Sequence, residues 1–197
     1  KIVNRNAEHL LRLVNQILDF RKIDTGTQKP HLKPTNMKKF LYGIYESFSI
    51  EAKRKNIEYL LLIKEKNLMI NTDKDMLEKI LSNLLSNAFK FTNEHGKIEL
   101  TGYTENPQDT KPQFVIKVLD NGIGIAKEKQ KQIFDRFYSD STKSAYKTEG
   151  VGIGLALTKE LTNILAGNIE VISSPGEGST FILKFPVEGG KPNRQPT

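Results

Sequence analysis

One run of apolar side chains constrains the fold of this chain more than any other feature of its sequence. From Thr72 to Phe91 these side chains recur at intervals of three and four residues, the period of an α-helix with one buried face. Thr72 or Asp73 can cap the first turn of such a helix. We therefore expect a helix from Thr72 or Asp73 to about Phe91, with these positions buried: Met76, Leu77, Ile80, Leu81, Leu84, Leu85 and Ala88.

Segments with strand and helix patterns lie on both sides of this run. Strand patterns cover residues 57–63, 97–104, 113–119, 168–173 and 180–186. Helix patterns cover residues 36–55 and about 152–167, with a short helix near residues 128–137. This order favours an α+β fold, a two-layer α/β sandwich in which helices cover one face of a mixed, mainly antiparallel sheet.

Residues 1–25 predict a separate helix. Their apolar side chains follow at spacings of four and then three residues and form one wide stripe. Such a stripe suits a helix packed in a bundle whose other members lie outside this chain. Gly26 ends the helix, and two prolines mark residues 27–35 as a linker. We expect a folded domain over residues 36–188 and a flexible tail over residues 189–197.

Composition narrows the classes of function. The chain has no cysteine, which excludes disulfides, thiolate zinc sites and cysteine nucleophiles and fits a reducing compartment such as the cytoplasm. No apolar run approaches the roughly 20 residues that cross a bilayer. The net charge is +7, but 23 acidic side chains are mixed with 30 basic ones. We interpret the excess as a solvated face that suits a polyanion such as ATP rather than nucleic acid.

The end of the central helix carries a polar face. Asn83, Asn87 and Lys90 are separated by four and then three residues, so their side chains share one side of the helix. An amide oxygen such as that of Asn87 suits an octahedral Mg²⁺ that takes its other ligands from water and phosphates. Lys90 adds a positive charge for those phosphates. The alternative is an ordinary solvated helix face.

Asp120 to Ile125 follow directly after a predicted strand. Asp120 could accept a hydrogen bond from an exocyclic amine such as that of adenine, and Gly122 and Gly124 would let a flat ring approach the backbone. A tight turn of Asp, Asn and Gly explains the same residues without a ligand.

A second glycine pattern, Gly150 to Leu157, opens the last predicted helix. Glycines at alternate positions free backbone N–H groups for phosphate, and the helix N-terminus adds its positive dipole end. No Gly-Lys-Ser/Thr follows, so this is not a Walker A loop. The alternative is a flexible hinge with close helix packing.

Two further segments offer weaker signals. Phe134 and Phe137 have helical spacing and suit anchors for a loop, with Arg136 between them as a contact for a γ-phosphate. Thr180 follows a turn with two glycines and could reach the polar edge of a buried ligand, although a plain hairpin explains that segment equally well.

In this order the segments resemble the N, G1, F and G2 boxes of sensor histidine kinases of two-component systems. The joint pattern covers about residues 72–160 and is far more specific than its parts. Residues 1–26 are similar to the second helix of that family's dimerisation and phosphoacceptor domain. The resemblance implies a Bergerat-type α/β sandwich of the GHKL superfamily, shared with gyrase-like topoisomerases, mismatch-repair ATPases and a heat-shock chaperone.

The resemblance also implies a role for each matching residue. Asn87 would bind Mg²⁺, Asn83 would lie near the γ-phosphate, and Lys90 would contact phosphate. Phe91 would pack against the base, and Asp120 would bind the adenine amine. The remaining expected contacts with ATP are Gly122, Gly124, Ile125, Gly150, Val151, Gly152, Gly154, Leu155 and Thr180, and the expected catalytic set is Asn83, Asn87, Lys90 and Arg136.

The implied function is that of a histidine protein kinase. Asn83 stands where other branches of the superfamily have a glutamate that activates water, which argues for transfer to a protein rather than hydrolysis. The γ-phosphoryl of Mg·ATP would pass to a histidine of a dimerisation domain and then to an aspartate of a response-regulator receiver domain. The full-length protein would be a homodimer, with no nucleic-acid partner and with this chain as the cytoplasmic portion of a membrane-anchored bacterial sensor.

Alternatives remain open beside this kinase. His9, His31 and His95 lack the neighbours of a phosphoacceptor histidine, so we expect that this chain does not phosphorylate itself. A GHKL-type ATPase clamp would need a water-activating glutamate near residue 83 and a transducer domain, and neither is visible. A catalytically silent nucleotide-binding module is the third interpretation.

Overall fold

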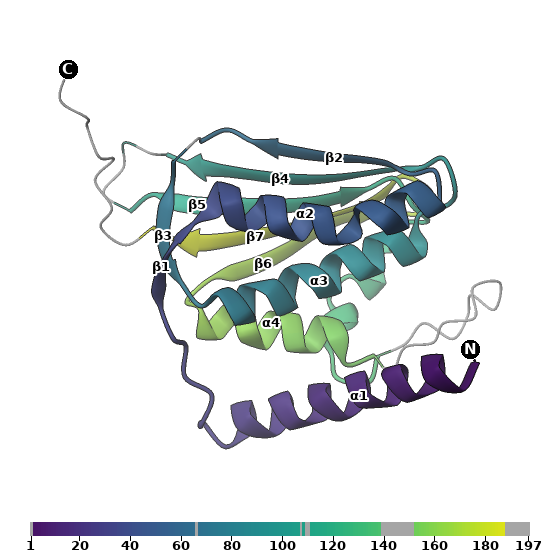
Figure 1. The fold of residues 1–197 in the computed structure, drawn as a ribbon, viewed down its shortest axis with the longest axis horizontal. Coiled ribbons are helices and arrows are strands. Elements are labelled where there is room, and N and C mark those ends of the chain that lie inside the picture. Colours follow the sequence, from purple (N-terminus) through teal and green to yellow (C-terminus); the bar gives the residue numbers. More distant parts are fainter. Residues whose placement is uncertain (1, 66, 107, 109–110, 139–151, 188–197) are drawn as a thin grey trace.

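The molecule has two layers, a sheet and a set of helices on one of its faces (Figure 1). The computed structural model describes residues 2–65, 67–106, 108, 111–138 and 152–187, with the backbone alone for residues 2–9, 12 and 13. Three helices form the covering layer: α2 (Met37–Arg54), α3 (Lys74–Phe91) and α4 (Gly154–Ile164).

The main sheet has five strands in the order β2-β4-β5-β7-β6. Their bounds are β2 Glu58–Ile63, β4 Lys97–Glu105, β5 Gln113–Asp120, β6 Asn168–Ser174 and β7 Gly178–Pro186. Only β2 pairs in parallel, with β4, and every other pair in this sheet is antiparallel. This arrangement confirms the predicted mixed, mainly antiparallel sheet with helices on one face.

The central helix α3 forms where its sequence predicts it. Asp73 is the N-cap, and its Oδ1 accepts hydrogen bonds from the backbone N–H groups of Asp75 and Met76, both at 3.0 Å. All the positions expected to be buried are buried, because they face the sheet and the neighbouring helices. The helix ends at Phe91, beside the ends of β4 and β5.

A second, two-stranded sheet was not predicted. β1 (Lys33–Asn36) pairs antiparallel with β3 (Met69–Thr72), so the segment expected to be a linker ends in a strand. Each strand has only four residues, too few to show an alternating pattern, and Pro34 lowers the strand signal further.

The predicted short helix near residues 128–137 is also wrong. Two 3₁₀ turns take its place, η1 (Lys127–Lys129) and η2 (Gln132–Phe134). An α-helix cannot continue through this segment because Asp135 is extended and Phe137 has a left-handed backbone, with φ 64°.

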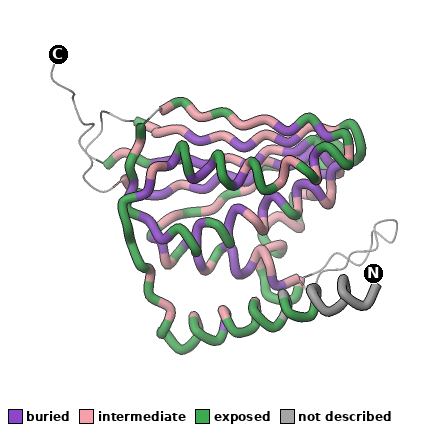
Figure 2. The backbone as a smooth tube through the Cα atoms, viewed as in Figure 1, coloured by how far each residue is buried: buried purple, intermediate pink, exposed green. Residues whose placement is uncertain are grey.

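The first helix, α1 (Ile2–Asp24), runs along the helical layer on the side away from the sheet (Figure 1). Figure 2 shows that most of its described length is exposed. Its apolar stripe lies in water, each of these side chains being at least half exposed: Leu10, Leu11, Val14, Ile17 and Leu18. Phe20 alone among its described side chains is buried. No described helix has the length and apolar character needed to span a membrane.

Candidate functional site

The polar face of α3 divides into two parts with different surroundings. Asn83 and Asn87 are both half-buried. The side-chain amide of Asn83 donates a hydrogen bond to Thr158 Oγ1 of α4 at 2.8 Å. The Asn87 side chain makes no hydrogen bond to another residue within the described ranges. The whole side-chain amide of Asn87 is therefore available to a ligand, whereas the amide nitrogen of Asn83 is engaged by α4.

Lys90 and Phe91 form the last turn of α3. The Lys90 Nζ lies 5.1 Å from the centroid of the Phe91 ring, and both side chains are half-buried. The backbone oxygen of Phe91 accepts a hydrogen bond from the N–H of Ile123 at 3.3 Å. This contact brings the Asp120 to Ile125 loop against the end of α3. A single ATP site that uses both segments requires them to be adjacent.

Asp120 ends β5 and lies at the centre of this junction. Its side chain is on the helix-covered face of the sheet, because it lies two residues after Val118 and four after Ile116, both core residues of the same strand. Asp120 is only 6% exposed, and its Oδ1 accepts a hydrogen bond from the N–H of Gly122 at 2.9 Å. Burial raises the pKa of Asp120, while hydrogen bonds from the backbone of Gly122 and Ser179 oppose the shift. The site thus holds a buried acceptor.

The loop after Asp120 is fixed to the β6–β7 hairpin. The backbone N–H of Ile125 donates to Ser173 Oγ at 2.8 Å, and the N–H of Gly176 donates to the oxygen of Ile123 at 2.8 Å. A Cβ on Gly124, where φ is 65°, would lie 1.8 Å from the backbone oxygen of Ser174. Glycine is required here by contact with the hairpin, whether or not Gly122, Gly124 and Ile125 also line a base.

Strand pairing corrects the prediction for Thr180. Asp120 lies opposite Ser179 in the β5–β7 ladder, and Leu119 lies opposite Thr180. Successive side chains of a strand point to opposite faces, so Thr180 lies on the face away from Asp120. Ser179 is buried on the Asp120 side, and its Oγ is 3.0 Å from Ser173 Oγ. Alternation counted back from the core residue Phe181 could have identified Ser179.

The second glycine segment is described only in part, since Gly150 and Val151 lie outside the described residues. Gly152 O accepts a hydrogen bond from the N–H of Phe137 at 3.0 Å. Gly154 begins α4, and Leu155 packs against the core. The residue before the helix, Ile153, provides no side-chain cap, which leaves the first N–H groups of α4 available to an anion.

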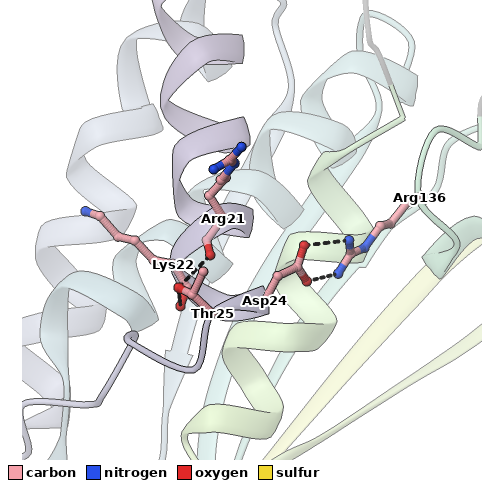
Figure 3. A network of polar contacts seen from close by, with 5 residues as sticks. All are labelled: Arg21, Lys22, Asp24, Thr25 and Arg136. Atoms are coloured by element: carbon pink, nitrogen blue, oxygen red, sulfur yellow. Dashed lines mark hydrogen bonds and ion pairs between the residues drawn. The ribbon is translucent and has the colours of Figure 1, made fainter.

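Arg136 does not take the predicted place beside this face. Figure 3 shows its guanidinium turned toward α1, where it forms a bidentate ion pair with Asp24 at 2.6 and 3.1 Å. The guanidinium carbon also lies 4.5 Å from the centroid of the Phe20 ring. The hydrogen bond from Arg136 lowers the pKa of Asp24. In this structure Arg136 contacts α1 rather than the polar face of α3, and its role as a phosphate contact stays a prediction.

The two aromatic anchors also differ from each other. Phe134 packs edge to face on Phe181, with the ring centroids 6.5 Å apart, which confirms its role as an anchor. Phe137 is 68% exposed and anchors nothing in the core, because its left-handed backbone directs it outward. The expectation for Phe137 was wrong.

Residues 72–189 match the model of the family described as histidine kinase-, DNA gyrase B- and HSP90-like ATPase. The chain belongs to this family. It is 33% identical over 190 residues to the circadian input-output histidine kinase CikA of Synechococcus elongatus, covering 95% of this chain and 24% of that protein. It thus spans about a quarter of the length of this relative, and less of others. The resemblance to sensor histidine kinases is therefore confirmed, and an ATPase clamp is not favoured.

Solved structures agree with this assignment. Full-length ShkA, crystallised in complex with AMPPNP, superposes with a TM-score of 0.81 at 28% identity, over 96% of this chain and 38% of that one. The structure of histidine kinase ThkA in complex with response regulator protein TrrA has a TM-score of 0.70 at 21% identity, over 99% of this chain and 52% of that one. The expected two-layer fold is confirmed.

Proposed function

We propose that this chain is the ATP-binding catalytic part of a sensor histidine kinase. It transfers the γ-phosphoryl of Mg·ATP to a histidine on a dimerisation domain, and the phosphoryl group then passes to an aspartate of a response regulator. The observation that carries this proposal is the buried carboxyl group of Asp120. It lies where the end of β5 meets the end of α3 and the β6–β7 hairpin.

Asp120 is suited to recognise the adenine amine. One carboxylate oxygen accepts the backbone hydrogen bond from Gly122, and a carboxylate retains further acceptor sites. A buried carboxylate is costly even with the backbone hydrogen bonds from Gly122 and Ser179, so an exocyclic amine that donates to a remaining acceptor site would stabilise it further. Phe91, at the adjacent end of α3, supplies an apolar ring near the base.

The magnesium ion would be held by Asn87. In the described part of the chain no group of three or more His, Cys, Asp or Glu side chains could hold a metal ion. A single amide oxygen is the donor set of a Mg²⁺ site whose other ligands are phosphate oxygens and water. The Asn87 side chain on α3, which has no hydrogen-bond partner within the described ranges, fits that role. The ion, when bound, neutralises charge on the phosphates.

The phosphate end is provided by α4 and Lys90. The uncapped N-terminus of α4 offers backbone N–H groups and the positive end of the helix dipole. Lys90 adds charge from α3 on the other side. Gly152, Gly154 and Leu155, with Gly150 and Val151, form the segment that would close over the phosphates. Catalysis then consists of positioning the γ-phosphoryl in line with an imidazole and stabilising its charge.

The partners follow from the family and from the relatives. ShkA in complex with AMPPNP supports ATP as the nucleotide, and ThkA in complex with TrrA supports a receiver-domain partner. We assign residues 1–26 to the second helix of a dimerisation domain that forms a homodimer in the full-length protein. The acceptor histidine comes from another segment or another protomer, since no histidine of this chain has the neighbours that the family's acceptor has.

Binding of Mg·ATP to four variants tests this proposal. Asp120→Asn and Asn87→Ala should each weaken binding at least about tenfold, because each removes a direct contact. Ser179→Ala should weaken binding to a smaller extent, whereas Thr180→Ala is the matched control on the opposite face of the sheet and should bind as the parent does. If Asp120→Asn and Asn87→Ala both bind Mg·ATP as tightly as the parent, the site is wrongly assigned.

Phosphoryl transfer requires a second measurement. Mixed with a dimerisation domain that carries its histidine, the chain should transfer labelled phosphate from ATP to that histidine. Binding without any transfer would favour a silent nucleotide-binding module.

A further inference from the structure

The two helices that flank the proposed phosphate site pack against each other in the core, and a side-chain hydrogen bond also links them. Asn83 projects from the middle of α3 onto the first turns of α4. Its Nδ2 donates to Thr158 Oγ1 at 2.8 Å, and Thr158 is 1% exposed. Thr158 is held in turn by its own helix, because its backbone oxygen accepts a hydrogen bond from Thr162 Oγ1 at 2.7 Å. The Asn83 amide is therefore committed to contact between helices.

The same amide explains why residue 154 is glycine. A Cβ on Gly154 would lie 2.4 Å from Asn83 Oδ1, 2.8 Å from its Nδ2 and 3.0 Å from its Cγ. Gly154 is not among the glycines with positive φ, so its backbone conformation is open to any residue. Space for the Asn83 side chain is what requires the absence of a side chain there. Gly152, with φ 71°, is glycine for a different reason.

This contact lies between two groups that must act together in the proposed function. Asn87 lies one turn beyond Asn83 on α3, and Gly154 begins the helix whose N–H groups face the phosphates. A shift of α4 against α3 would move the phosphate-binding N–H groups away from the magnesium ligand. Errors of about 1 Å in such a site cost up to about 100-fold in rate.

We propose that Asn83 is a positioning residue that sets the spacing between α3 and the N-terminus of α4, and that Gly154 is glycine to receive it. The inference rests on the proposed function and replaces the expected direct role of Asn83 at the γ-phosphate. Asn83 acts through α4, and Thr158 is its partner.

A cycle of four proteins tests the spacing: the parent, Asn83→Ala, Gly154→Ala and the double variant. Gly154→Ala should weaken Mg·ATP binding by about tenfold or more in the parent, because the new methyl group displaces α4. In the Asn83→Ala background the same change should have little effect, since the methyl group enters space that the amide has left. Equal losses in both backgrounds would mean that Gly154 serves the phosphates directly, and would overturn the proposal.

Two further variants separate positioning from direct contact. Thr158→Val keeps the shape of the side chain and removes the acceptor, so it should reproduce the loss of affinity seen in Asn83→Ala. Thr35→Val is the matched control, because Thr35 is a buried threonine of β1 whose hydroxyl donates to the backbone oxygen of Lys33. If Thr158→Val binds Mg·ATP as the parent does while Asn83→Ala does not, Asn83 contacts the ligand itself and the proposal fails.

A loss of stability and a loss of nucleotide binding can be measured separately in these variants. Thermal unfolding without nucleotide identifies any variant that is merely destabilised. Transfer assays should show a higher KM for ATP, with kcat less affected when ATP is saturating. A parent that binds no Mg·ATP would overturn the proposed function together with this role. A parent that binds, with independent effects of the two substitutions, would overturn the role alone.

Discussion

At the scale of single residues, the buried carboxyl group of Asp120 lowers the stability of the folded protein while it serves the proposed binding of adenine. Its folded-state pKa is raised because burial disfavours the charge. The stability it contributes is therefore fully present below the ordinary pKa of aspartate and is lost as pH rises through the raised value. Above the raised pKa the protein carries a buried charge, which lowers its free energy of unfolding.

Asp120→Asn should consequently raise the Tm of the nucleotide-free protein at neutral pH while it weakens ATP binding. The gain should shrink as the solution is acidified, because the parent then binds its proton. Scanning calorimetry at several pH values measures the first effect and titration calorimetry the second. A nucleotide-free variant that is less stable than the parent at neutral pH would contradict this account.

Tyr59 offers a second test at this scale. Its hydroxyl is buried without a hydrogen-bond partner among the described residues, and burial raises its pKa. Tyr59→Phe removes the unpaired group, so its stability should equal or exceed that of the parent. Tyr45→Phe is the control, because the Tyr45 hydroxyl donates to the backbone oxygen of Tyr59 at 3.2 Å. Chemical denaturation should show that the control loses about 0.5–1.5 kcal/mol, and equal losses in both variants would refute the distinction.

At the scale of elements, periodicity determined what could be predicted. The 18-residue helix α3 was placed to within two residues at its start because its apolar pattern spans several turns. The four-residue strands of the β1–β3 ribbon carry no such pattern. Motif spacing placed Asn87 and Lys90 on one face of α3, and the resemblance to sensor histidine kinases joined them with Asp120 in one predicted site. It could not show that Asn83 binds α4 or that Arg136 binds α1, because those partners are distant in the sequence.

The docking of α1 yields an element-scale prediction. Arg136 and Asp24 form an exposed ion pair, Phe20 packs beneath the guanidinium, and Lys79 Nζ lies 2.6 Å from Asp19. Arg136→Ala removes both the pair and the contact with the ring. Backbone hydrogen exchange in the last turns of α1 should then accelerate by about two- to fivefold.

Arg54→Ala is the matched control for this exchange experiment, because Arg54 also forms an exposed ion pair, with Glu51 of the same helix, away from α1. The arginine lowers the pKa of Asp24, so the docking it supports should persist above the ordinary aspartate pKa and weaken as pH falls through the lowered value. Unchanged exchange in Arg136→Ala would show that the ion pair does not hold the helix.

At the scale of the whole molecule, the proposed site joins elements that the chain places far apart. The end of α3, the end of β5, the β6–β7 hairpin and the start of α4 meet there through backbone and side-chain contacts. A ligand that bridges them stabilises the folded state as a unit, since the unfolded chain has no such site.

Mg·ATP at about 100 times its Kd should therefore add about 2.7 kcal/mol to the free energy of unfolding. For a chain of this size that gain corresponds to a rise in Tm of about 5–10 °C. Chelation of magnesium should remove most of the rise, and Asp120→Asn should remove it at the same nucleotide concentration. Arg136→Ala should keep it, because the Arg136 guanidinium is bound to α1 and not to the phosphates. If Mg·ATP no longer raises the Tm of Arg136→Ala, Arg136 contacts the nucleotide, and α1 and ATP compete for its guanidinium group.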